Sequence, residues 1–250
     1  MALYPAAVLK LIPHANQRLA SLRNRVNLHT AVTDAQSLYP YFSRPGNPCS
    51  HFYVREDGVV EQYIDTKYYS AADYQGNDAT VSIETWDGYG RLWTSGQPPA
   101  WTPPQVTSLG RLCRWILQSH RSIPPRLAED SVPGPSSFGI SSHRLGVDPW
   151  RHPDGMRYST AYGKVCPGDR RIAQIPTILA AVQQDQTLKE VDDMLIIRRQ
   201  SDGASFIVIG GRGARIANTT DLQEYRSAGI QTVNLTDSGY SAAQARYLNS

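Results

Sequence analysis

The stretch RVNLHT, residues 25–30, decides the fold of this chain. The apolar side chains of Val26 and Leu28 alternate with polar ones, which is the period-2 pattern of a β-strand. His29 is the last side chain of the alternation, so the strand delivers an imidazole to the edge of a sheet. We therefore expect a strand at residues 25–29 that ends in a histidine.

Two further segments carry related chemistry. In GISSH, residues 139–143, a short extended run again ends in an imidazole, that of His143, and GKVCPG, residues 163–168, contributes the thiol of Cys166. Two imidazoles and a thiolate form a borderline-soft ligand set that suits Zn²⁺ and leaves a fourth position open. Bound zinc lowers the pKa of a water to about 7 and polarises a carbonyl group, as amide hydrolysis requires. Taken singly, the three residues also fit an alternative in which they are unrelated, because most lone histidines and cysteines are structural.

The order of the segments favours the first interpretation. The hairpin-like SHFYVREDGVVEQY at residues 50–63 and VSIE at residues 81–84 lie between the RVNLHT strand and the two later segments. In this order, from about residue 28 to 175, the chain resembles the zinc-dependent N-acetylmuramoyl-L-alanine amidases, the type 2 amidase family related to peptidoglycan recognition proteins. The resemblance implies an α/β fold, with a mixed central β-sheet flanked by helices. It also implies cleavage of the amide between N-acetylmuramic acid and the L-alanine of the stem peptide.

The resemblance assigns a role to five residues. His29, His143 and Cys166 would be the ligands of one Zn²⁺ ion. Glu84 matches a glutamate that serves as general base in one branch of the family, and Lys164 matches the lysine that stabilises the oxyanion. A carboxylate near the metal can take a proton from water and return it to the leaving amine, and a fixed cation stabilises developing negative charge. Without the resemblance, Glu84 and Lys164 would be read as solvated surface charges.

The chain also departs from the family's pattern. Another branch has a catalytic tyrosine where this chain has Ser50, which makes Glu84 the better candidate for the base and leaves Tyr53 as a reserve. The segment YSAA, residues 69–72, lacks the substrate-contacting histidine found in relatives. Residues 149–155 read as an inserted loop, which we expect to shape the substrate groove.

Composition limits the function classes. The 250 residues suffice for one α/β core with a small appendage, and the net charge is +3, from 25 basic and 22 acidic residues. This small basic excess favours approach to an anionic wall of bacterial peptidoglycan but is too small to indicate nucleic acid. Three cysteines, an odd number, argue against a disulfide framework. We expect Cys113 in the core and Cys49 in a loop or in packing, with a Cys49–Cys113 pair as the alternative.

The first twelve residues read neither as a membrane span nor as a secretory signal, since they are short, lack an early cationic region and contain Pro5 and Lys10. We therefore expect no membrane insertion. The expected location is the host cytoplasm, where the chain would be made without a signal peptide. It would act on the cell wall after release, as a phage endolysin does.

The pattern predicts a catalytic domain at residues 1–188 that begins with an irregular arm at residues 1–24. The expected strands and helices of this domain are a strand at 25–29, a short helix at 35–43, a hairpin of strands 51–56 and 59–64, a strand at 81–84, a helix from 103 to 119, a strand before His143 and a helix from 176 to 184. His120 lies at the C-terminal end of the helix from 103 to 119, where the helix dipole favours a cation, so it is read as a structural residue.

Residues 191–250 read as a small, separate β-rich module. Strands at 194–198 and 206–209 flank SDG, residues 201–203, a strong hairpin signal. Further strands are expected at 215–217 and 231–233, with a helix near 222–228. A wall-targeting element, an assembly element and a simple stabilising extension all remain open for this module, as does the oligomeric state.

Several side chains remain candidates for supporting roles. Four tryptophans could stack on sugar rings, namely Trp86, Trp93, Trp101 and Trp150. Asp148 and Asp154 could orient an imidazole, and His51 is read as a core residue or a supporting residue. Two other functions stay open beside the zinc amidase: a non-catalytic peptidoglycan-binding module of the same fold, and a zinc peptidase that cuts another amide of the wall.

Overall fold

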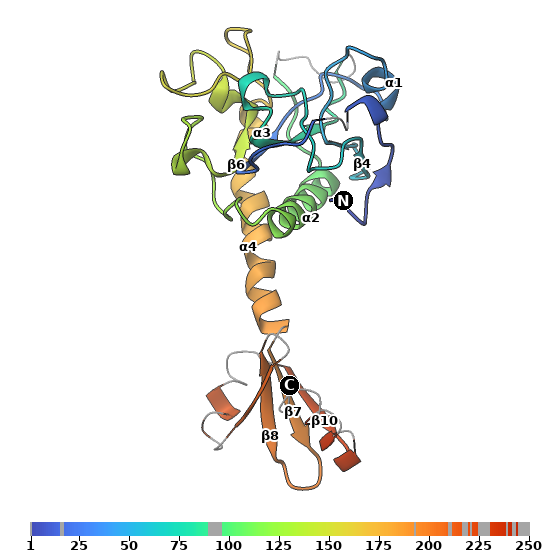
Figure 1. Cartoon of the computed structure of the whole chain (residues 1–250), viewed down its shortest axis with the longest axis vertical. Coiled ribbons are helices and arrows are strands. Elements are labelled where there is room, and N and C mark those ends of the chain that lie inside the picture. Colours follow the sequence, from blue (N-terminus) through green and yellow to red (C-terminus); the bar gives the residue numbers. More distant parts are fainter. Residues whose placement is uncertain are drawn as a thin grey trace. The chain divides into compact units, whose positions relative to one another are not determined.

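The computed structural model describes residues 2–15, 18–89, 97–192 and 194–209, and of the remainder 212–216, 220, 222–224, 231–238, 240–241 and 244. The chain divides into two compact units, residues 1–182 and 183–250 (Figure 1). The limits 1–188 for the catalytic domain and 191–250 for the β-rich module remain a prediction. Within the described residues, no helix combines the length and the apolar character needed to cross a membrane.

The first unit contains a mixed sheet of six strands in the order β1-β4-β3-β5-β2-β6. The strands are β1 (Val8–Leu9), β2 (Arg25–Leu28), β3 (Phe52–Val54), β4 (Val60–Gln62), β5 (Thr80–Thr85) and β6 (Gly139–Ser142). Only β3 and β4 pair antiparallel; the remaining neighbours are parallel. This arrangement confirms the expected α/β fold with a mixed central sheet.

The register of the parallel strands places three side chains of interest at one level. Leu28 of β2 pairs with Ile83 of β5 and with Ser142 of β6. The residues that follow are His29, Glu84 and His143, so all three lie at the carboxyl edge of adjacent strands. This edge is where open α/β sheets bind their ligands.

Helix α2 (Pro103–Ser119) covers the core of the first unit (Figure 1). It begins with a capping box, in which the Thr102 hydroxyl accepts from the Gln105 N–H and the Gln105 side chain accepts from the Thr102 N–H. Its apolar face, with Leu109, Leu112 and Ile116 all 0% exposed, packs into one cluster with the strands. Ile178 and Val182 of α4 (Ile175–Asp192) join the same cluster.

Several elements differ from the sequence-based expectation. The arm contributes strand β1, which pairs with β4. The helix expected at 35–43 is only α1 (Tyr39–Phe42), where Pro40 occupies the first turn and needs no N–H partner. The helix expected to end at 184 continues to Asp192. The His120 ring lies 2.7 Å from the Thr66 hydroxyl, as suits the expected structural role, but burial lowers its pKa to about 4, so the ring is neutral at pH 7 and not the cation that the helix dipole favours.

The second unit contains a sheet of four strands in the order β10-β7-β8-β9, which confirms the β-rich character expected there. The strands are β7 (Met194–Arg199), β8 (Ser205–Ile209), β9 (Arg212–Arg215) and β10 (Gln231–Leu235). The β7–β8 hairpin turns at Gly203, whose φ of +72° suits glycine. Ile196 and Ile207 form a small buried core. Of the helix expected at 222–228, residues 222–224 are helical, and 225–228 lie outside the described residues.

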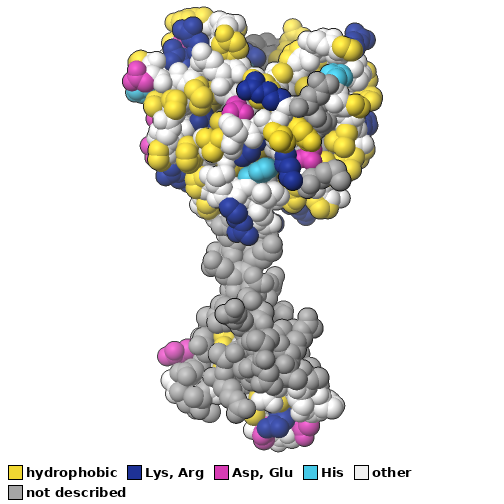
Figure 2. Space-filling view, viewed as in Figure 1, with side chains coloured by type: hydrophobic (Ala, Val, Ile, Leu, Met, Phe, Trp, Pro, Cys, Tyr) yellow, Lys and Arg dark blue, Asp and Glu magenta, His cyan; other side chains and the backbone are white. Residues whose placement is uncertain are grey.

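The charged side chains of the first unit are dispersed on the face shown in Figure 2. Lys and Arg side chains lie in separate small groups among hydrophobic and polar ones, and this face carries no continuous basic patch in the described region. All three cysteines are free and buried, so Cys49 and Cys113 do not pair.

Candidate metal centre and active site

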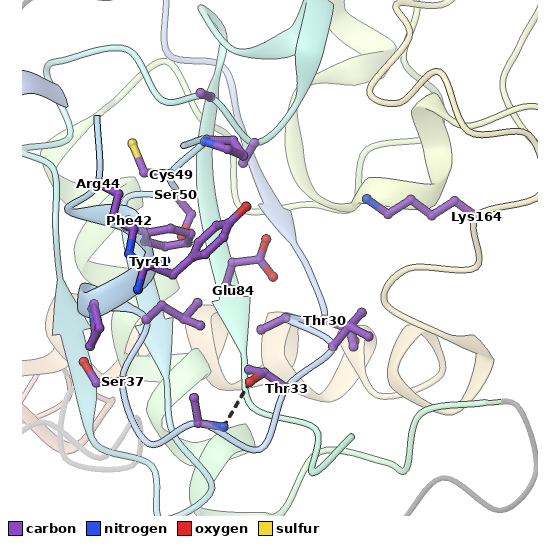
Figure 3. Close-up of a pocket in the computed structure, with 18 residues that line it drawn as sticks. Thr30, Thr33, Ser37, Tyr41, Phe42, Arg44, Cys49, Ser50, Glu84 and Lys164 are labelled. Atoms are coloured by element: carbon purple, nitrogen blue, oxygen red, sulfur yellow. Dashed lines mark hydrogen bonds between the residues drawn. The ribbon is translucent and has the colours of Figure 1, made fainter. Parts of the chain in front are cut away.

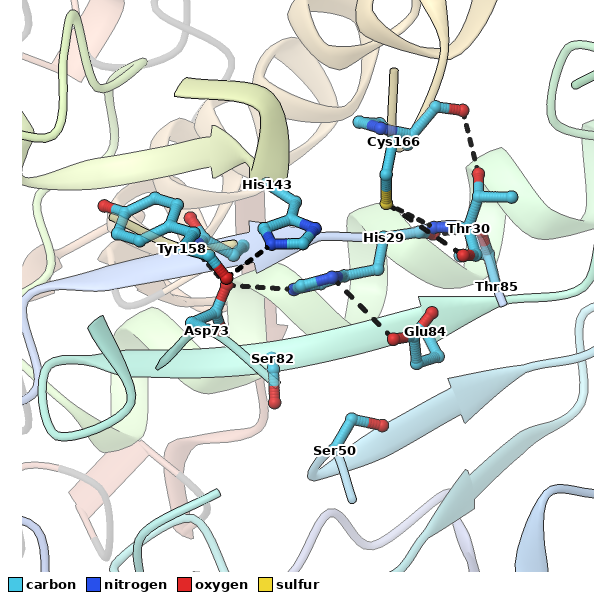
Figure 4. Close-up of polar contacts among 12 residues, drawn as sticks. His29, Thr30, Ser50, Asp73, Ser82, Glu84, Thr85, His143, Tyr158 and Cys166 are labelled. Atoms are coloured by element: carbon cyan, nitrogen blue, oxygen red, sulfur yellow. Dashed lines mark hydrogen bonds and ion pairs between the residues drawn. The ribbon is translucent and has the colours of Figure 1, made fainter. Parts of the chain in front are cut away.

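Three side chains converge at the carboxyl edge of the sheet. Each of His29, His143 and Cys166 offers one ligand atom, and these three atoms lie within 4.8 Å of one another. All three residues are buried (Figure 4). The two imidazole rings are 4.5 Å apart between centroids. His29 and His143 follow β2 and β6, and Cys166 comes from the loop before α3 (Asp169–Ile172). The sheet register brings the histidines together, and the loop places the thiol beside them.

His143 has one nitrogen bonded and one free. Its Nε2 lies 2.9 Å from the main-chain oxygen of Tyr158. Because a carbonyl oxygen only accepts, Nε2 carries the proton and Nδ1 carries the lone pair. Nδ1 is buried and has no hydrogen-bond partner in the described structure. Nδ1 therefore keeps a buried lone pair beside the second imidazole and the thiol. The hydrogen bond from Nε2 fixes the orientation of the ring, as is usual for a histidine that binds a metal.

His29 is oriented by a carboxylate. Its Nε2 lies 3.1 Å from Oδ1 of Asp73, and its Nδ1 lies 3.7 Å from Oε1 of Glu84 (Figure 4). The Asn27 amide donates to the same Asp73 oxygen at 2.7 Å. Burial alone would raise the pKa of Asp73, but the neighbouring His29 lowers it to about 2. Asp73 therefore remains an anion that holds the proton on Nε2 and leaves Nδ1 available to a metal.

Cys166 lies in surroundings that favour the thiolate. Burial by itself raises the pKa of this thiol, but the adjacent His143 and His29 imidazoles lower it well below its ordinary value. The backbone N–H of Thr30 also donates to Sγ at 3.2 Å. A thiolate and two imidazoles with free nitrogens fit Zn²⁺ with one coordination position left open.

Glu84 and Lys164 line a cavity of about 760 Å³ beside these ligands (Figure 3). The Glu84 side chain is 17% exposed, and burial raises its pKa above the ordinary value. Lys164, two residues before Cys166, is exposed and points into the same space (Figure 3). The cavity wall includes the apolar or aromatic residues Leu38, Pro40, Tyr41, Phe42, Pro48, Ala71 and Ala72. Thus the five residues predicted from the sequence lie around one site.

The positions that depart from the family's pattern have structural duties. Ser50 lines the cavity, and its hydroxyl donates to the main-chain oxygen of Phe52 at 2.9 Å. The Tyr53 hydroxyl donates to the Ala35 oxygen at 2.6 Å, and burial raises the pKa of Tyr53 above its ordinary value. Tyr53 is fully buried and does not line the cavity, so it is not a suitable reserve base.

The groups that orient the imidazoles were missed in the sequence. Asp148, one of the two expected partners, instead binds Arg151 at 3.0 Å and Arg157 at 3.2 Å. Asp154, the other, lies 3.9 Å from His152. Asp73 lies in a loop that has no periodic pattern of apolar residues, so the sequence around it did not indicate its role. The Tyr158 acceptor is a main-chain oxygen, which side-chain patterns do not indicate.

The tryptophans differ in their access to a ligand. Trp86 and Trp101 are 2% and 3% exposed and serve as packing residues. Trp150 is 44% exposed, and the Arg144 guanidinium lies 5.0 Å from the centre of its ring. Trp93 lies outside the described residues. Among the described tryptophans named as sugar-stacking candidates, Trp150 alone has an open ring.

This fold and this site define the class of the chain: an α/β protein with a candidate metal site at the carboxyl edge of its parallel strands. The family model of N-acetylmuramoyl-L-alanine amidase, Amidase_2, matches residues 13–169, and the chain belongs to this family. Membership supports amidase activity on peptidoglycan. No curated protein sequence matches the chain.

Solved structures similar to this chain include a bacterial hydrolase, an endolysin amidase and an insect protein. Staphylococcus aureus hydrolase AmiA in complex with its ligand has a TM-score of 0.50 at 12% identity, covering 75% of this chain and 86% of that one. An endolysin amidase, LysCS from Clostridium intestinale URNW, has a TM-score of 0.46 at 15% identity, covering 73% and 99%. Drosophila peptidoglycan recognition protein SD has a TM-score of 0.42 at 9% identity, covering 68% and 93%. At these identities the likeness concerns the fold alone.

Proposed function

We propose that the chain is a zinc-dependent N-acetylmuramoyl-L-alanine amidase that hydrolyses the amide between N-acetylmuramic acid and L-alanine in bacterial peptidoglycan. The observation that carries the proposal is the convergence of His29, His143 and Cys166 within 4.8 Å, in a chain of the amidase family. A non-catalytic binding module has no need for three buried ligands with free donor atoms.

The residues of the site divide the chemistry between them. Zinc, when held by the two histidines and Cys166, polarises the scissile carbonyl and lowers the pKa of water to about 7. Glu84 takes the proton from the attacking water and hands it to the leaving amine, a task that suits a carboxylate of raised pKa. Lys164, on the cavity wall, supplies a positive charge that stabilises the negative charge developing on the carbonyl oxygen.

The cavity accommodates the substrate around the scissile bond. Glu84 and Lys164 lie on its wall, and Tyr41, Phe42 and Arg44 line another part of it (Figure 3). The apolar part of the wall suits the lactyl group and the alanine methyl group of the substrate, and the few charged side chains suit its carboxylates. We assign this cavity to the substrate of the proposed reaction.

Digestion of purified muropeptides tests the proposal. The protein is incubated with them with and without a chelator, and the fragments are identified by mass. We expect free L-alanine-terminated stem peptides from the zinc-loaded protein and none after chelation. Intact muramyl-alanine linkages in the zinc-loaded sample reject the amidase, and a cut within the peptide identifies the zinc peptidase instead. Wall binding without any cleavage identifies the binding module.

The role as a phage lysin is a second part of the proposal, and it follows from the expectation that the chain is made inside the host. Co-expression with a pore-forming membrane protein should lyse a bacterial host, whereas the chain alone should leave the cells intact. Lysis by the chain alone contradicts this role without affecting the amidase assignment.

A further inference from the structure

Arg171, on α3, is a fully buried arginine close to the metal centre. Its side chain is 0% exposed, and its guanidinium carbon lies 5.7 Å from the centre of the Trp101 ring. The guanidinium donates four hydrogen bonds to neutral acceptors. These acceptors are the Pro99 oxygen at 2.8 Å, the Thr30 hydroxyl at 3.0 Å, the Thr85 hydroxyl at 2.7 Å and the Trp86 oxygen at 2.9 Å.

Two of these acceptors hold the segments that carry the site. The Thr85 hydroxyl, next to Glu84 on β5, donates to the main-chain oxygen of His29 at 2.5 Å. The Thr30 hydroxyl donates to the main-chain oxygen of Pro167 at 2.8 Å, and the Thr30 N–H donates to Cys166 Sγ. Each hydroxyl therefore accepts from Arg171 and donates onward to a segment that bears a ligand.

Among the described residues, no carboxylate lies close enough to form an ion pair with Arg171. None of the ion pairs formed within the described part of the chain includes it. Burial lowers its pKa to about 10, while the negative charges of Asp87 and Cys166 act in the opposite direction. Arg171 therefore stays charged at neutral pH. Because a buried charge needs compensation, the anions of the site and the four acceptors are what stabilise it.

We propose that Arg171 is a positioning residue of the metal centre: one guanidinium ties together the end of β2 that carries His29, the part of β5 that carries Glu84, and the loop that carries Cys166. The inference rests on the proposed function, since it assumes that these side chains bind metal and substrate. Arg171 touches neither directly and acts through Thr30 and Thr85.

Arg171→Lys separates geometry from charge. A lysine keeps the positive charge, but its single ammonium group cannot reach four acceptors on separate segments. Titration of the metal-free protein with Co²⁺, followed by the thiolate-to-cobalt charge-transfer absorption, measures assembly of the ligands independently of activity. We expect the Co²⁺ affinity and kcat of Arg171→Lys to fall about 10- to 100-fold, the range for groups that orient metal ligands. Arg171→Met also removes the charge, so its Co²⁺ affinity and kcat should be lower still.

Arg23→Lys is the matched control. Arg23 is also buried and donates to main-chain oxygens, among them those of Thr66 and Thr80, but it lies before the amino end of β2. Its lysine variant should lose thermal stability while keeping wild-type cobalt affinity. A folded Arg171→Lys with unchanged cobalt affinity and kcat overturns the proposal.

Thr85 provides a second test if Arg171→Lys does not fold. Thr85→Val keeps the shape but removes the hydroxyl, and it should weaken cobalt binding, whereas Thr85→Ser should restore it. Wild-type affinity in Thr85→Val overturns the proposal. If the wild-type protein itself binds no Co²⁺ and releases no stem peptide, the proposed function has failed; an active wild type with equally active variants rejects only the role of Arg171.

Discussion

At the scale of single residues, the site separates groups that react from groups that hold them in place. His29, His143 and Cys166 present donor atoms, while Asp73 and the Tyr158 oxygen fix the two rings from behind. Glu84 and Lys164 face the cavity. Substitutions in the three groups should therefore fail in different ways.

Glu84→Ala and Lys164→Ala should keep the metal and lose most turnover. Loss of a general base lowers kcat about 10²- to 10⁴-fold, and loss of a group that stabilises the oxyanion lowers it about 10²- to 10³-fold. Cys166→Ser should lose metal first. Metal content by atomic absorption and stem-peptide release separate these outcomes. The exposed Glu56→Ala and Lys67→Ala are matched controls, and full activity in Glu84→Ala shows that another group deprotonates the water.

Asp73→Ala should weaken metal binding about 10- to 100-fold, because His29 loses the carboxylate that fixes its ring and tautomer. Asp73→Asn keeps an acceptor oxygen, so its loss should be smaller. Competition with a chelator of known affinity measures both variants. Asp148→Asn is the control, since Asp148 binds two arginines instead of an imidazole. A metal affinity lowered in Asp148→Asn but not in Asp73→Ala contradicts this assignment.

Because of His51, we expect the folded protein to be less stable in mild acid than at neutral pH. It is fully buried beside Arg23, and burial together with that charge lowers its pKa well below the ordinary value. The unfolded chain takes up a proton on this histidine below about pH 6.5 and the folded chain does not, so stability falls as the pH falls, by up to about 1.4 kcal/mol per pH unit.

Urea unfolding at pH 7.0 and 5.5 checks this expectation. His51→Gln should show a smaller loss of unfolding free energy between the two pH values than the wild type. The exposed His152→Gln should keep the wild-type pH dependence. An equal pH dependence in His51→Gln shows that other groups control the acid sensitivity.

Sequence reasoning at this scale found the residues whose chemistry is distinctive. A cysteine before Pro-Gly and two strand-ending histidines stand out by type and position, whereas Glu84 and Lys164 were identified through the resemblance to the amidase family. Asp73 and Arg171 did not stand out, because their importance depends on burial and on partners distant in the sequence. The expected second partners, Asp148 and Asp154, were chosen by closeness in sequence, which does not determine closeness in space.

At the scale of elements, the parallel pairs of β2 with β5 and β6 assemble the site. Alternating patterns predicted strands β2, β5 and β6 closely, and the hairpin-like segment at residues 50–63 predicted the β3–β4 hairpin. The pattern did not reveal β1, because two residues are too few to show periodicity. It also ended α4 early, since Leu188 and Val191 are the only apolar residues between 185 and 192 and are too few to extend the pattern.

Thr102→Ala should destabilise the protein by about 1 kcal/mol, the usual effect of losing an N-cap. The Thr102 hydroxyl accepts from Gln105 and donates to the Glu56 oxygen at 2.7 Å, so it joins α2 to the hairpin. Urea unfolding measures the change, and kcat of the folded variant should be unaffected because the cap is not at the cavity. Thr107→Ala, on the exposed side of α2, is the control and should not destabilise. Equal stability of both variants shows that the cap contributes little.

At the scale of the whole molecule, the chain consists of two compact units, and α4 contributes residues to both. A change of pattern after residue 190 predicted a second, β-rich part. Its role could not be predicted, because none of its residues matches a chemical motif. Catalysis, in the proposed function, belongs to the first unit.

A chain that ends at residue 192, with α4 complete, should hydrolyse soluble muropeptides at the rate of the full chain. Pull-down with intact cell walls then distinguishes the roles left open for the second unit. Weaker wall binding by the shortened chain indicates targeting, and equal binding with a lower melting temperature indicates a stabilising extension. Loss of hydrolysis by a folded shortened chain contradicts the assignment of catalysis to the first unit.

The groups that hold the two imidazoles differ in whether a point mutation can remove them. The partner of His29 is a side chain, which a single nucleotide change in the gene can remove. The partner of His143 is a main-chain oxygen, which every amino acid at position 158 would still supply. Random mutagenesis at codon 73 should therefore remove the partner of His29, whereas replacements at codon 158 should remove the packing of the buried Tyr158 ring and keep the oxygen that holds His143.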